Sequence, residues 1–516
     1  MKKILEYLII SISGTLLALS FPKYNFYIFS LFSLVPIFYF LEQLNPIVAG
    51  FAWSMPYFFI LLYWLPYTIE KYGNLSPFLS WGVLFLLSLY LSIFYAFLFY
   101  AIKIARLLKN PTFFKGLVVG LLWCGTEFLR ANLFTGFSWG ELGYLLSNFP
   151  LLLQIADIFG IWGLSLVVIL INYFFFFLFC NKICVKNKVS FLLFLSFFSF
   201  LIFYGIWCKA HFSKIIKKAP EIRVAILQGN IPQEIKNESD ISYSLNTYLE
   251  MFVQIPPDTE LVLTPETALP FFFPDDPPSM PVLNFFKKKK STFVIGAFRL
   301  GKKQNLSPKY YNTLFVIKNG QIVDFYDKEK LVPFGEYVPL ANYLSFLKKF
   351  TVGLTSLSPG YGKNLKLPLA KEKISATPLI CFESAFSELL RKRVKESQLV
   401  LIATNDAWFD KSSAPFQHFQ MAIVRAVEAR KYILQAANTG ISGIIDPLGK
   451  VIKKSRLNQR IILYGKVRLI KKEPLFATFG DILGKSGALL LILLLIYLPL
   501  KNKFSRKALS PDLYRE

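Results

Sequence analysis

Seven apolar segments follow one another in the first 210 residues, and an eighth lies near the end of the chain. A transmembrane helix needs about 20 consecutive, mainly apolar residues. Glu127 and Arg130 make the fifth segment the least regular. The pattern predicts a membrane domain at 1–210, a returning helix at 484–500 and a tail at 501–516. The expected spans of the membrane domain are 4–21, 25–42, 47–68, 77–101, 114–131, 158–180 and 189–208.

The composition supports a membrane protein with a polar part. Hydrophobic residues make up 54% of the chain and charged residues 17%, against about 25% charged residues in ordinary globular proteins. The formal net charge is +26, which is a feature of many nucleic-acid-binding proteins. However, the sequence has no zinc-finger spacing, RNA-binding signature or basic heptad region. A basic surface facing anionic phospholipid fits better, and no nucleic acid partner is expected.

Lysine and arginine residues in the short loops predict the orientation, because they concentrate on the cytoplasmic side. With the N-terminus inside, the inside segments carry about 14 of these residues and the outside loops about three. The inside residues are Lys2, Lys3, Lys103, Arg106, Lys109, Lys115, Lys182, Lys186, Lys188, Lys501, Lys503, Arg506, Lys507 and Arg515; those outside are Lys23, Lys71 and Arg130. We therefore expect both termini in the cytoplasm and the polar region on the outer side of the membrane.

Residues 220–470 form one polar block, whose length suits one large α/β domain. Near-continuous runs of Val, Ile and Leu predict strands that are buried on both faces. Helical segments at 386–397 and 420–433 separate some of these runs. The expected strands lie at 223–228, 261–266, 293–298, 313–317, 375–382, 399–405 and 442–452.

Residues 132–157 are too interrupted for a helix and too apolar for an ordinary loop. One interpretation is a re-entrant or interfacial packing segment. The other is that Trp139, Glu141 and the neighbouring aromatics line an entrance for lipid. Both remain open, because Trp and Tyr are common at membrane interfaces without any function.

Among the five cysteines, only Cys381 lies in the polar block. It comes at the carboxyl end of an apolar run, where the sites of α/β sheets gather. A buried free cysteine more often serves as a small apolar residue. A nucleophilic thiol needs a base or an electropositive setting. His211 and His418 are the only histidines, so a histidine-rich metal site is excluded, and no metal or organic cofactor is expected.

Two further residues follow β-like runs in the same way as Cys381. Glu266 follows LVLTP, and Lys328 follows IVDFYD. Taken singly, each is an ordinary surface residue. Taken together with Cys381, they form a Glu–Lys–Cys set at strand ends.

Three segments that hold these residues resemble the catalytic segments of the nitrilase superfamily: PETALP, YDKEKLVPFGEYVP and ICFES. The longer context resembles one branch, the apolipoprotein N-acyltransferases. The further matching segments are ILQGNIPQ, FFFP, YYNTLFV, NDAWF, PFQHFQMA and TEFLRANLFTGFSWGELGY. The resemblance covers nearly the whole chain and implies an α-β-β-α sandwich on an eight-helix membrane base.

The resemblance implies that Glu266 is the general base, Lys328 the oxyanion stabiliser and Cys381 the nucleophile. Glu336 and Glu383 match further functional carboxylates. An alternative role for Glu336 is to brace the loop around Lys328, and one for Glu383 is to hold a turn of the main chain.

The chain departs from the family pattern at two positions. Phe382 stands where the pattern has Tyr, so ring packing is retained but a proton role for the hydroxyl is not expected. Asn237 stands near the place of a Trp, so no gating aromatic is expected there. One of three neighbouring phenylalanines is a candidate replacement, and the residues considered for substrate contact are Trp139, Phe271, Phe272, Phe273, Trp408 and His418.

The implied reaction is transfer of a fatty acyl chain from a phospholipid, typically phosphatidylethanolamine, through a thioester on Cys381. The acceptor would be the α-amine of a diacylglyceryl-cysteine at the N-terminus of a lipoprotein. Nothing in the sequence requires more than a monomer.

Two other functions remain as alternatives. A membrane-tethered amidase or nitrilase would use the same residues with water as the acceptor, although seven further helices exceed the needs of an anchor. A transporter or scaffold would carry no chemistry in the polar block. Transporters usually place charges within their spans, and the predicted spans are nearly free of charge.

Overall fold

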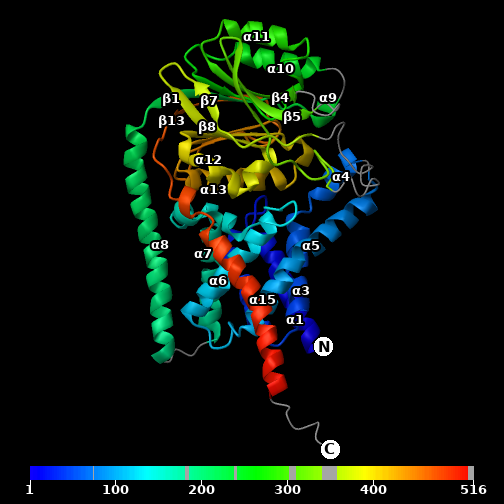
Figure 1. The fold of residues 1–516 in the computed structure, drawn as a ribbon, viewed down its shortest axis with the longest axis vertical. Helices are drawn as coiled ribbons and strands as arrows, with labels where there is room; N and C mark the ends of the chain where they lie inside the picture. The colour runs from blue at the N-terminus through cyan, green and yellow to red at the C-terminus, as the bar shows by residue number, and fades with distance from the viewer. Residues whose placement is uncertain (74, 181–184, 238–240, 302–308, 340–356, 509–516) are drawn as a thin grey trace, which may run out of the picture.

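A computed structural model describes residues 1–73, 75–180, 185–237, 241–301, 309–339 and 357–508. A bundle of helices forms one end of the molecule, and a domain of two sheets forms the other (Figure 1). Helix α1 begins, and α15 ends, at the end of the bundle that lies away from the sheets. This arrangement agrees with the predicted division into an apolar base and a polar α/β domain.

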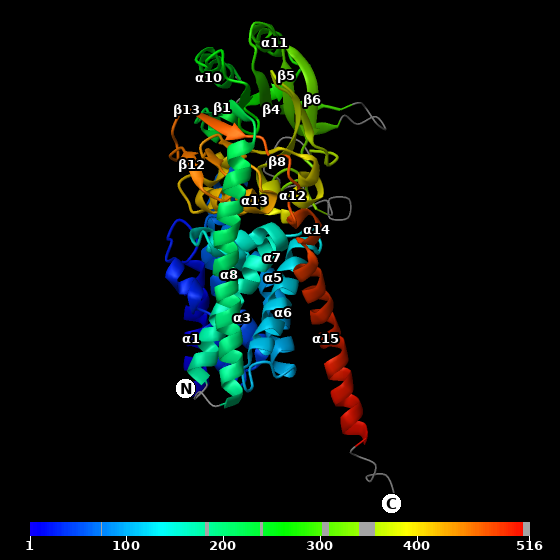
Figure 2. The ribbon, with the colours of Figure 1, turned by 90° about the vertical axis from the view of Figure 1, so that its left-hand side faces the viewer.

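The base consists of eleven described helical elements before the sheets and two after them. Helix α8 runs along the whole length of the base, and α15 descends on another side of it (Figure 2). The elements are α1 (Lys2–Ala18), η1 (Tyr27–Leu31), α2 (Val35–Phe40), α3 (Pro46–Leu61), α4 (Leu65–Gly73), α5 (Pro77–Ile104), α6 (Phe113–Asn132), η2 (Leu142–Asn148), η3 (Leu152–Ile155), α7 (Ala156–Cys180), α8 (Val185–Lys218), α14 (Phe476–Phe479) and α15 (Ile482–Ala508).

Four segments of the described chain are long and apolar enough to cross a membrane, at Pro77–Ile104, Leu152–Cys180, Asn187–Lys218 and Phe476–Tyr497. The pair α3 and α4, bent by 54°, would be a fifth. The protein is therefore an integral membrane protein, and the count of eight spans stays a prediction. The part of the predicted tail after residue 508 lies outside the described residues.

The second predicted span, 25–42, is not one helix. It folds as η1 and α2, and the buried side chain of Asn172 on α7 fills the break. Its amide donates to Ser30 O at 2.7 Å, and its oxygen accepts from Leu34 N at 2.9 Å. Main-chain groups in an apolar setting must be paired within the protein, so this polar side chain permits the interruption.

Two glycines bring α6 and α15 together. At Gly125 and Gly487 the two main chains lie so close that a Cβ atom on either would meet the other helix. Helices in membranes pack through such small residues, because apolar surface gains little by leaving lipid. This contact ties the returning helix to the base.

The polar domain is a four-layer α-β-β-α sandwich, which confirms the predicted fold class. One sheet has the order β13-β1-β2-β4-β5-β6, with β3 also paired to β4, and the other has the order β12-β11-β10-β9-β8-β7. The strands are β1 (Glu221–Gln228), β2 (Leu261–Leu263), β3 (Leu269–Phe272), β4 (Thr292–Leu300), β5 (Tyr310–Lys318), β6 (Gln321–Asp327), β7 (Leu365–Pro368), β8 (Lys373–Ile380), β9 (Leu399–Thr404), β10 (Ile433–Ala437), β11 (Gly443–Ile445), β12 (Val451–Lys454) and β13 (Ile461–Arg468).

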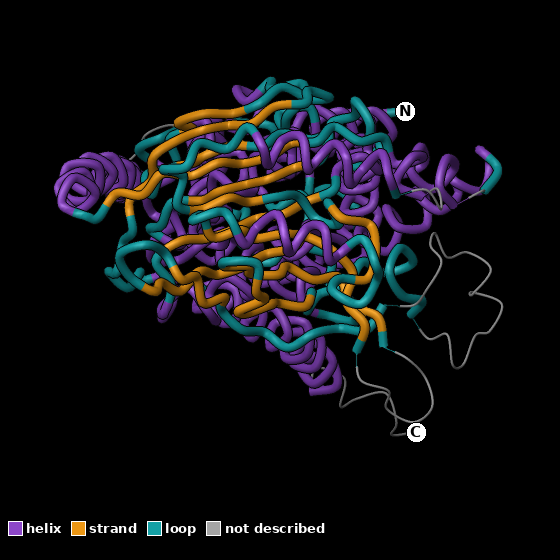
Figure 3. The backbone as a smooth tube through the Cα atoms, turned by 90° about the horizontal axis from the view of Figure 1, so that it is seen from above, coloured by secondary structure: helices purple, strands orange, loops and turns teal. Residues whose placement is uncertain are grey.

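Three hydrophobic cores define the layers. The first sheet packs on α10 and α11 through one core, and the two sheets pack on each other through a second. The outer face of the second sheet, α12 and α13 share the third core with the helices of the base. Figure 3 shows the sheets from above. The helices of the domain are α9 (Gln233–Asn237), α10 (Ser242–Val253), α11 (Ser279–Lys287), η5 (Cys381–Ala385), α12 (Ser387–Arg393), η6 (Val394–Glu396), η7 (Asp406–Phe409) and α13 (Ala414–Ala429).

Several predicted boundaries in this domain were wrong. Segment 442–452 is a hairpin of β11 and β12, because Asp446 accepts main-chain bonds from Leu448 and Lys450 across a turn. Helix α13 begins and ends earlier than predicted, since Pro415 favours a helix start and Arg430 is left-handed. Strands β3, β7, β10 and β13 were not predicted as strands.

Buried charges join the sandwich to the base. Arg430, at the end of α13, donates to Asp157 of α7 at 2.7 Å and to Gln154 at 2.6 Å. Gly160 interrupts α7 with φ 59°, and the carboxylate of Glu428 on α13 accepts a hydrogen bond from the main-chain amide of Ile161 at 2.8 Å.

Residues 132–157 lie at this junction and form no long helix, so they pack between the two parts of the molecule.

We predict that Arg430→Met lowers the thermal unfolding temperature in detergent by several degrees. Removing one partner of a buried ion pair leaves an uncompensated charge and costs about 3–5 kcal/mol. Arg460→Met is the matched control, because Arg460 pairs with Glu250 on the surface, where a pair contributes about 0–1 kcal/mol. Equal unfolding temperatures for both variants would contradict this role of the junction.

Candidate active site

Cys381 occupies a sharp bend directly after a strand. Strand β8 ends at Ile380, and Cys381 opens the 3-10 helix η5 with φ 51°. A left-handed conformation costs a residue other than glycine about 1–2 kcal/mol. This left-handed conformation turns Cys381 out of the sheet at the carboxyl edge. Cys381 is 9% exposed.

Lys328 lies between two carboxylates. It follows β6, and its Nζ atom lies 3.0 Å from Glu266 Oε1 and 2.9 Å from Glu336 Oε1. The amide of Asn312, on β5, donates to the same two oxygen atoms at 2.7 and 3.2 Å. The other Glu266 oxygen accepts from the main chain of Asn405 at 2.9 Å. Five residues from strands, strand ends and the loop after β6 thus form one hydrogen-bonded cluster.

The charges of this cluster act on the Cys381 thiol. Burial raises the pKa of Cys381 well above its usual value, Glu266 raises it further, and Lys328 opposes both. The thiol is therefore protonated at neutral pH and needs a base to form the nucleophile. The predicted residues Glu266, Lys328 and Cys381 are brought together by the fold.

Glu266 and Lys328 are both charged at neutral pH. Burial works to raise the pKa of Glu266, but Lys328 and Asn312 hold it below its usual value. Burial also works to lower the pKa of Lys328, but Glu266 and Glu336 raise it well above the ordinary value. The site therefore holds an available carboxylate base beside a fixed ammonium group.

Glu383 joins the Cys381 bend to the Lys328 segment. One carboxylate oxygen accepts from Tyr326 Oη at 2.8 Å and from the amides of Glu329 and Lys330 at 2.7 and 3.0 Å. The other accepts from Ile380 N at 2.6 Å. Glu383 is fully buried, so in this geometry it holds main-chain turns, the alternative given for it above.

Glu336 also holds a main-chain group. Its carboxylate accepts from Val332 N at 2.8 Å while it contacts Lys328.

Sequence reasoning missed Asn312, Asn405 and Lys236. The Nζ atom of Lys236, on α9, donates to Thr267 Oγ1 at 2.9 Å and to Glu266 O at 3.3 Å. Burial lowers the pKa of Lys236 to about 7. A second amine, which titrates near neutral pH, therefore lies beside the main chain of Glu266. Asn312 and Asn405 lie in the matching segments YYNTLFV and NDAWF, whereas Lys236 lies outside every matching segment.

The predicted substrate-contact residues at 271–273 lie in two different environments. Phe271 and Phe273 belong to the core under α10 and α11, whereas Phe272 is half-buried on the opposite face of β3. Trp139 is buried against Trp64, with ring centroids 5.3 Å apart, and donates to Gln417. Their roles toward substrate stay predictions.

The remaining candidates lie near Cys381 or near α4. The Phe382 ring is half-buried and packs edge-on against Phe386, with centroids 4.9 Å apart. Trp408 packs in the same way against Tyr72 of α4 at 4.8 Å. His418 is buried, with Nε2 3.1 Å from the main-chain oxygen of Cys381. The side chain of Asn237 lies outside the described part of the structure.

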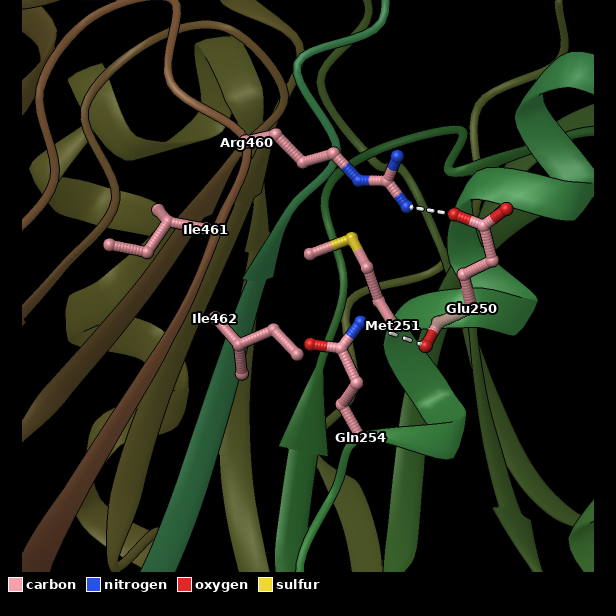
Figure 4. A pocket seen from close by; sticks show the side chains of 6 residues that line it. All are labelled: Glu250, Met251, Gln254, Arg460, Ile461 and Ile462. Carbon is pink, nitrogen blue, oxygen red and sulfur yellow. Dashed lines mark hydrogen bonds and ion pairs between the residues drawn. The ribbon is translucent and has the colours of Figure 1, made fainter.

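A hollow of about 410 Å³ lies elsewhere, between α10 and the start of β13 (Figure 4). Its lining includes Glu250, Met251 and Arg460, and none of the catalytic candidates. Among the described residues, no group of three or more His, Cys, Asp or Glu side chains is arranged to hold a metal ion.

Models of known protein families match both the helical base and the sandwich domain. The apolipoprotein N-acyltransferase N-terminal domain matches residues 13–174, and the carbon-nitrogen hydrolase family matches residues 223–471. The chain is 34% identical to an apolipoprotein N-acyltransferase from Geobacter metallireducens over 495 residues, covering 92% of each chain. It is 30% identical to the one from Pasteurella multocida over 513 residues, covering 96% of this chain and 95% of the relative.

A solved structure of glutamine-dependent NAD+ synthetase from Acinetobacter baumannii covers 51% of each chain at 15% identity, with a TM-score of 0.36. A likeness this weak carries no argument. The sandwich and its match to the carbon-nitrogen hydrolase family together confirm a nitrilase-like domain.

We predict that Glu383→Gln lowers the rate of acyl transfer by about 10²-fold, the effect of a misplacement of about 1 Å in an active site. The variant amide would turn an N–H group toward main-chain donors and loosen both turns. Initial rates of lysophospholipid release measure the effect. Glu388→Gln, an exposed change on α12, is the control, and equal rates for the two variants would contradict the role of Glu383.

We also predict opposite effects of two variants on alkylation of Cys381 by iodoacetamide below the pKa of the thiol. Glu266→Gln removes a negative charge, lowers the thiol pKa and accelerates alkylation by roughly tenfold, the effect of about one pKa unit. Lys328→Met raises the pKa and slows alkylation. Peptide mass spectrometry distinguishes Cys381 from the other cysteines. Changes in the same direction would show that charge does not set the reactivity of this thiol.

Proposed function

The chain belongs to the apolipoprotein N-acyltransferase family, and we propose that Cys381 carries its acyl group as a thioester between a phospholipid and a lipoprotein. The donor is a phospholipid such as phosphatidylethanolamine. The acceptor is the α-amine of the diacylglyceryl-cysteine at the N-terminus of a lipoprotein. The products are a lysophospholipid and a triacylated lipoprotein.

The observation that carries this proposal is the meeting of Cys381, Glu266 and Lys328 at the carboxyl ends of their strands. The Lys328 ammonium lies 3.0 Å from the Glu266 carboxylate, and both act on the Cys381 thiol. A protonated thiol, an ionised base and a fixed cation are the groups that thiol-based acyl transfer requires.

In the first half of the reaction, Glu266 takes the proton of the Cys381 thiol while sulfur attacks the ester carbonyl of the phospholipid. Lys328 places its positive charge beside the oxygen that becomes negative in the tetrahedral intermediate. The carbon–oxygen ester bond then breaks. The proton passes from Glu266 to the leaving oxygen, so that lysophospholipid departs and the thioester remains.

In the second half, the acceptor amine attacks the thioester carbonyl. Glu266 takes a proton from the amine, and the carbon–sulfur bond breaks. That proton then returns to the sulfur of Cys381, which restores the free thiol and leaves an amide bond on the lipoprotein. Dividing the transfer into two steps lowers the barrier of each.

Membrane attachment follows from the chemistry, because both substrates carry acyl chains. We place the protein in the bacterial inner membrane as a monomer, with the sandwich on the periplasmic side and both termini in the cytoplasm. The charges of the short loops support this orientation. The start of α1 and the end of α15 at the end away from the sheets also support it (Figure 1).

We predict that incubation with phosphatidylethanolamine in detergent raises the intact mass by one fatty acyl group, which hydroxylamine then removes. Cys381→Ala should gain no such mass, and Cys208→Ala, which changes a buried cysteine of α8, should behave as the parent. An unacylated parent that releases ammonia from small amides would favour the amidase alternative and exclude the lipid donor.

A further inference from the structure

The main-chain carbonyl of Cys381 is held by two side chains. His418 Nε2 lies 3.1 Å from this oxygen, and Ser384 Oγ donates to it at 2.9 Å. The same Ser384 oxygen lies 2.6 Å from His418 Nε2. Both side chains are buried, with exposures of 0% for Ser384 and 1% for His418. These two contacts thus fix the strained bend that presents the Cys381 thiol.

The other nitrogen of the ring has a charged partner. His418 Nδ1 lies 2.9 Å from Asp406 Oδ1, which also accepts from Thr404 Oγ1 at 2.8 Å. A carboxylate can only accept hydrogen bonds, so Nδ1 carries a proton in every ionisation state. The ring donates to Cys381 only when Nε2 is protonated as well, that is, when the imidazole is positively charged.

We propose that His418 is a positioning residue for acyl transfer, whose charged ring, oriented by Asp406, holds the Cys381 carbonyl and keeps the thiol in line with Glu266. This role differs from the substrate contact considered above for His418. It rests on the proposed thioester chemistry of Cys381.

Loss of the Nε2 proton would release the bend. A neutral ring with its proton on Nδ1 offers Nε2 as an acceptor, and the Ser384 hydroxyl would then turn from Cys381 O to the ring. The Cys381 carbonyl would lose both donors in one step. Acylation should therefore fall as pH rises through the pKa of His418, whereas ionisation of the thiol acts in the opposite direction.

Several groups surround the ring. Asp406 from η7 and, farther away, Glu266 are the charged groups that act on it, while Thr404 of β9, Ser384 of η5 and Trp139 are neutral. Burial works to lower the pKa of His418, but Asp406 raises it above the ordinary value. Lys236 also titrates near neutrality, so the test must report on His418 itself.

The two histidines of the chain make a direct test possible. His211 lies on α8 and contacts Lys472, away from the site, so His211→Gln leaves one ring signal in the histidine-labelled protein. We expect that signal to titrate above the usual pKa of about 6.5, and Asp406→Asn to move both the titration and the alkaline fall of acylation to lower pH. A fall that stays in place in Asp406→Asn would overturn the proposal.

Rates of thioester formation from phosphatidylethanolamine should separate two substitutions of the ring. His418→Gln keeps a donor without a titrating proton, so it should retain part of the rate and lack the alkaline fall. His418→Leu should lose about 10²-fold or more. A parent-like pH profile in His418→Gln, or a parent-like rate in His418→Leu, would overturn the proposal.

Alkylation of Cys381 by iodoacetamide distinguishes failure of this inference from failure of the proposed function. If the parent forms no acyl adduct, the lipid-donor proposal fails. The alkylation profile and the ring titration still test His418, because neither needs an acyl donor. Unchanged alkylation profiles in His418→Gln and Asp406→Asn would then overturn the positioning role independently.

Discussion

The buried ammonium group of Lys328 is the constraint on which the site depends. A buried charge is costly unless it is paired and hydrogen-bonded. Here it has two carboxylates, Glu266 and Glu336, and Asn312 bonds both of them. Because these residues come from separate strands and loops, satisfying one charge fixes the relative positions of several segments of the first sheet.

The same constraint explains why the resting site holds a thiol rather than a thiolate. Two carboxylates and one ammonium leave the cluster without a surplus of positive charge, and burial and Glu266 together outweigh Lys328 at Cys381. A sulfur that stays protonated is protected from unwanted chemistry. In the proposed reaction, it becomes nucleophilic when Glu266 accepts its proton during attack on a bound acyl group.

Sequence patterns predicted the residues at the ends of parallel strands, but not the groups that reach them from elsewhere. Glu266, Lys328 and Cys381 each follow a run that reads as a strand, and parallel strands bring their carboxyl ends together. Asn312 lies within β5, and Lys236 lies on the short helix α9, so no local pattern marked them. The break between η1 and α2 was missed because it depends on Asn172, far along the chain.

The turns after β8 and β9 contact the membrane base, which argues against a sandwich that is merely anchored. After β8, the carbonyl of Ala385 accepts from Ser138 and Tyr144 of the base. After β9, the carbonyl of Trp408 accepts from Thr68 of α4 at 2.9 Å. Since α12, α13 and the base share one hydrophobic core, the bend at Cys381 and the base form one packed unit. An enzyme with lipid substrates gains from this arrangement, because the depth of the thiol relative to the bilayer is then set by packing and not by a linker.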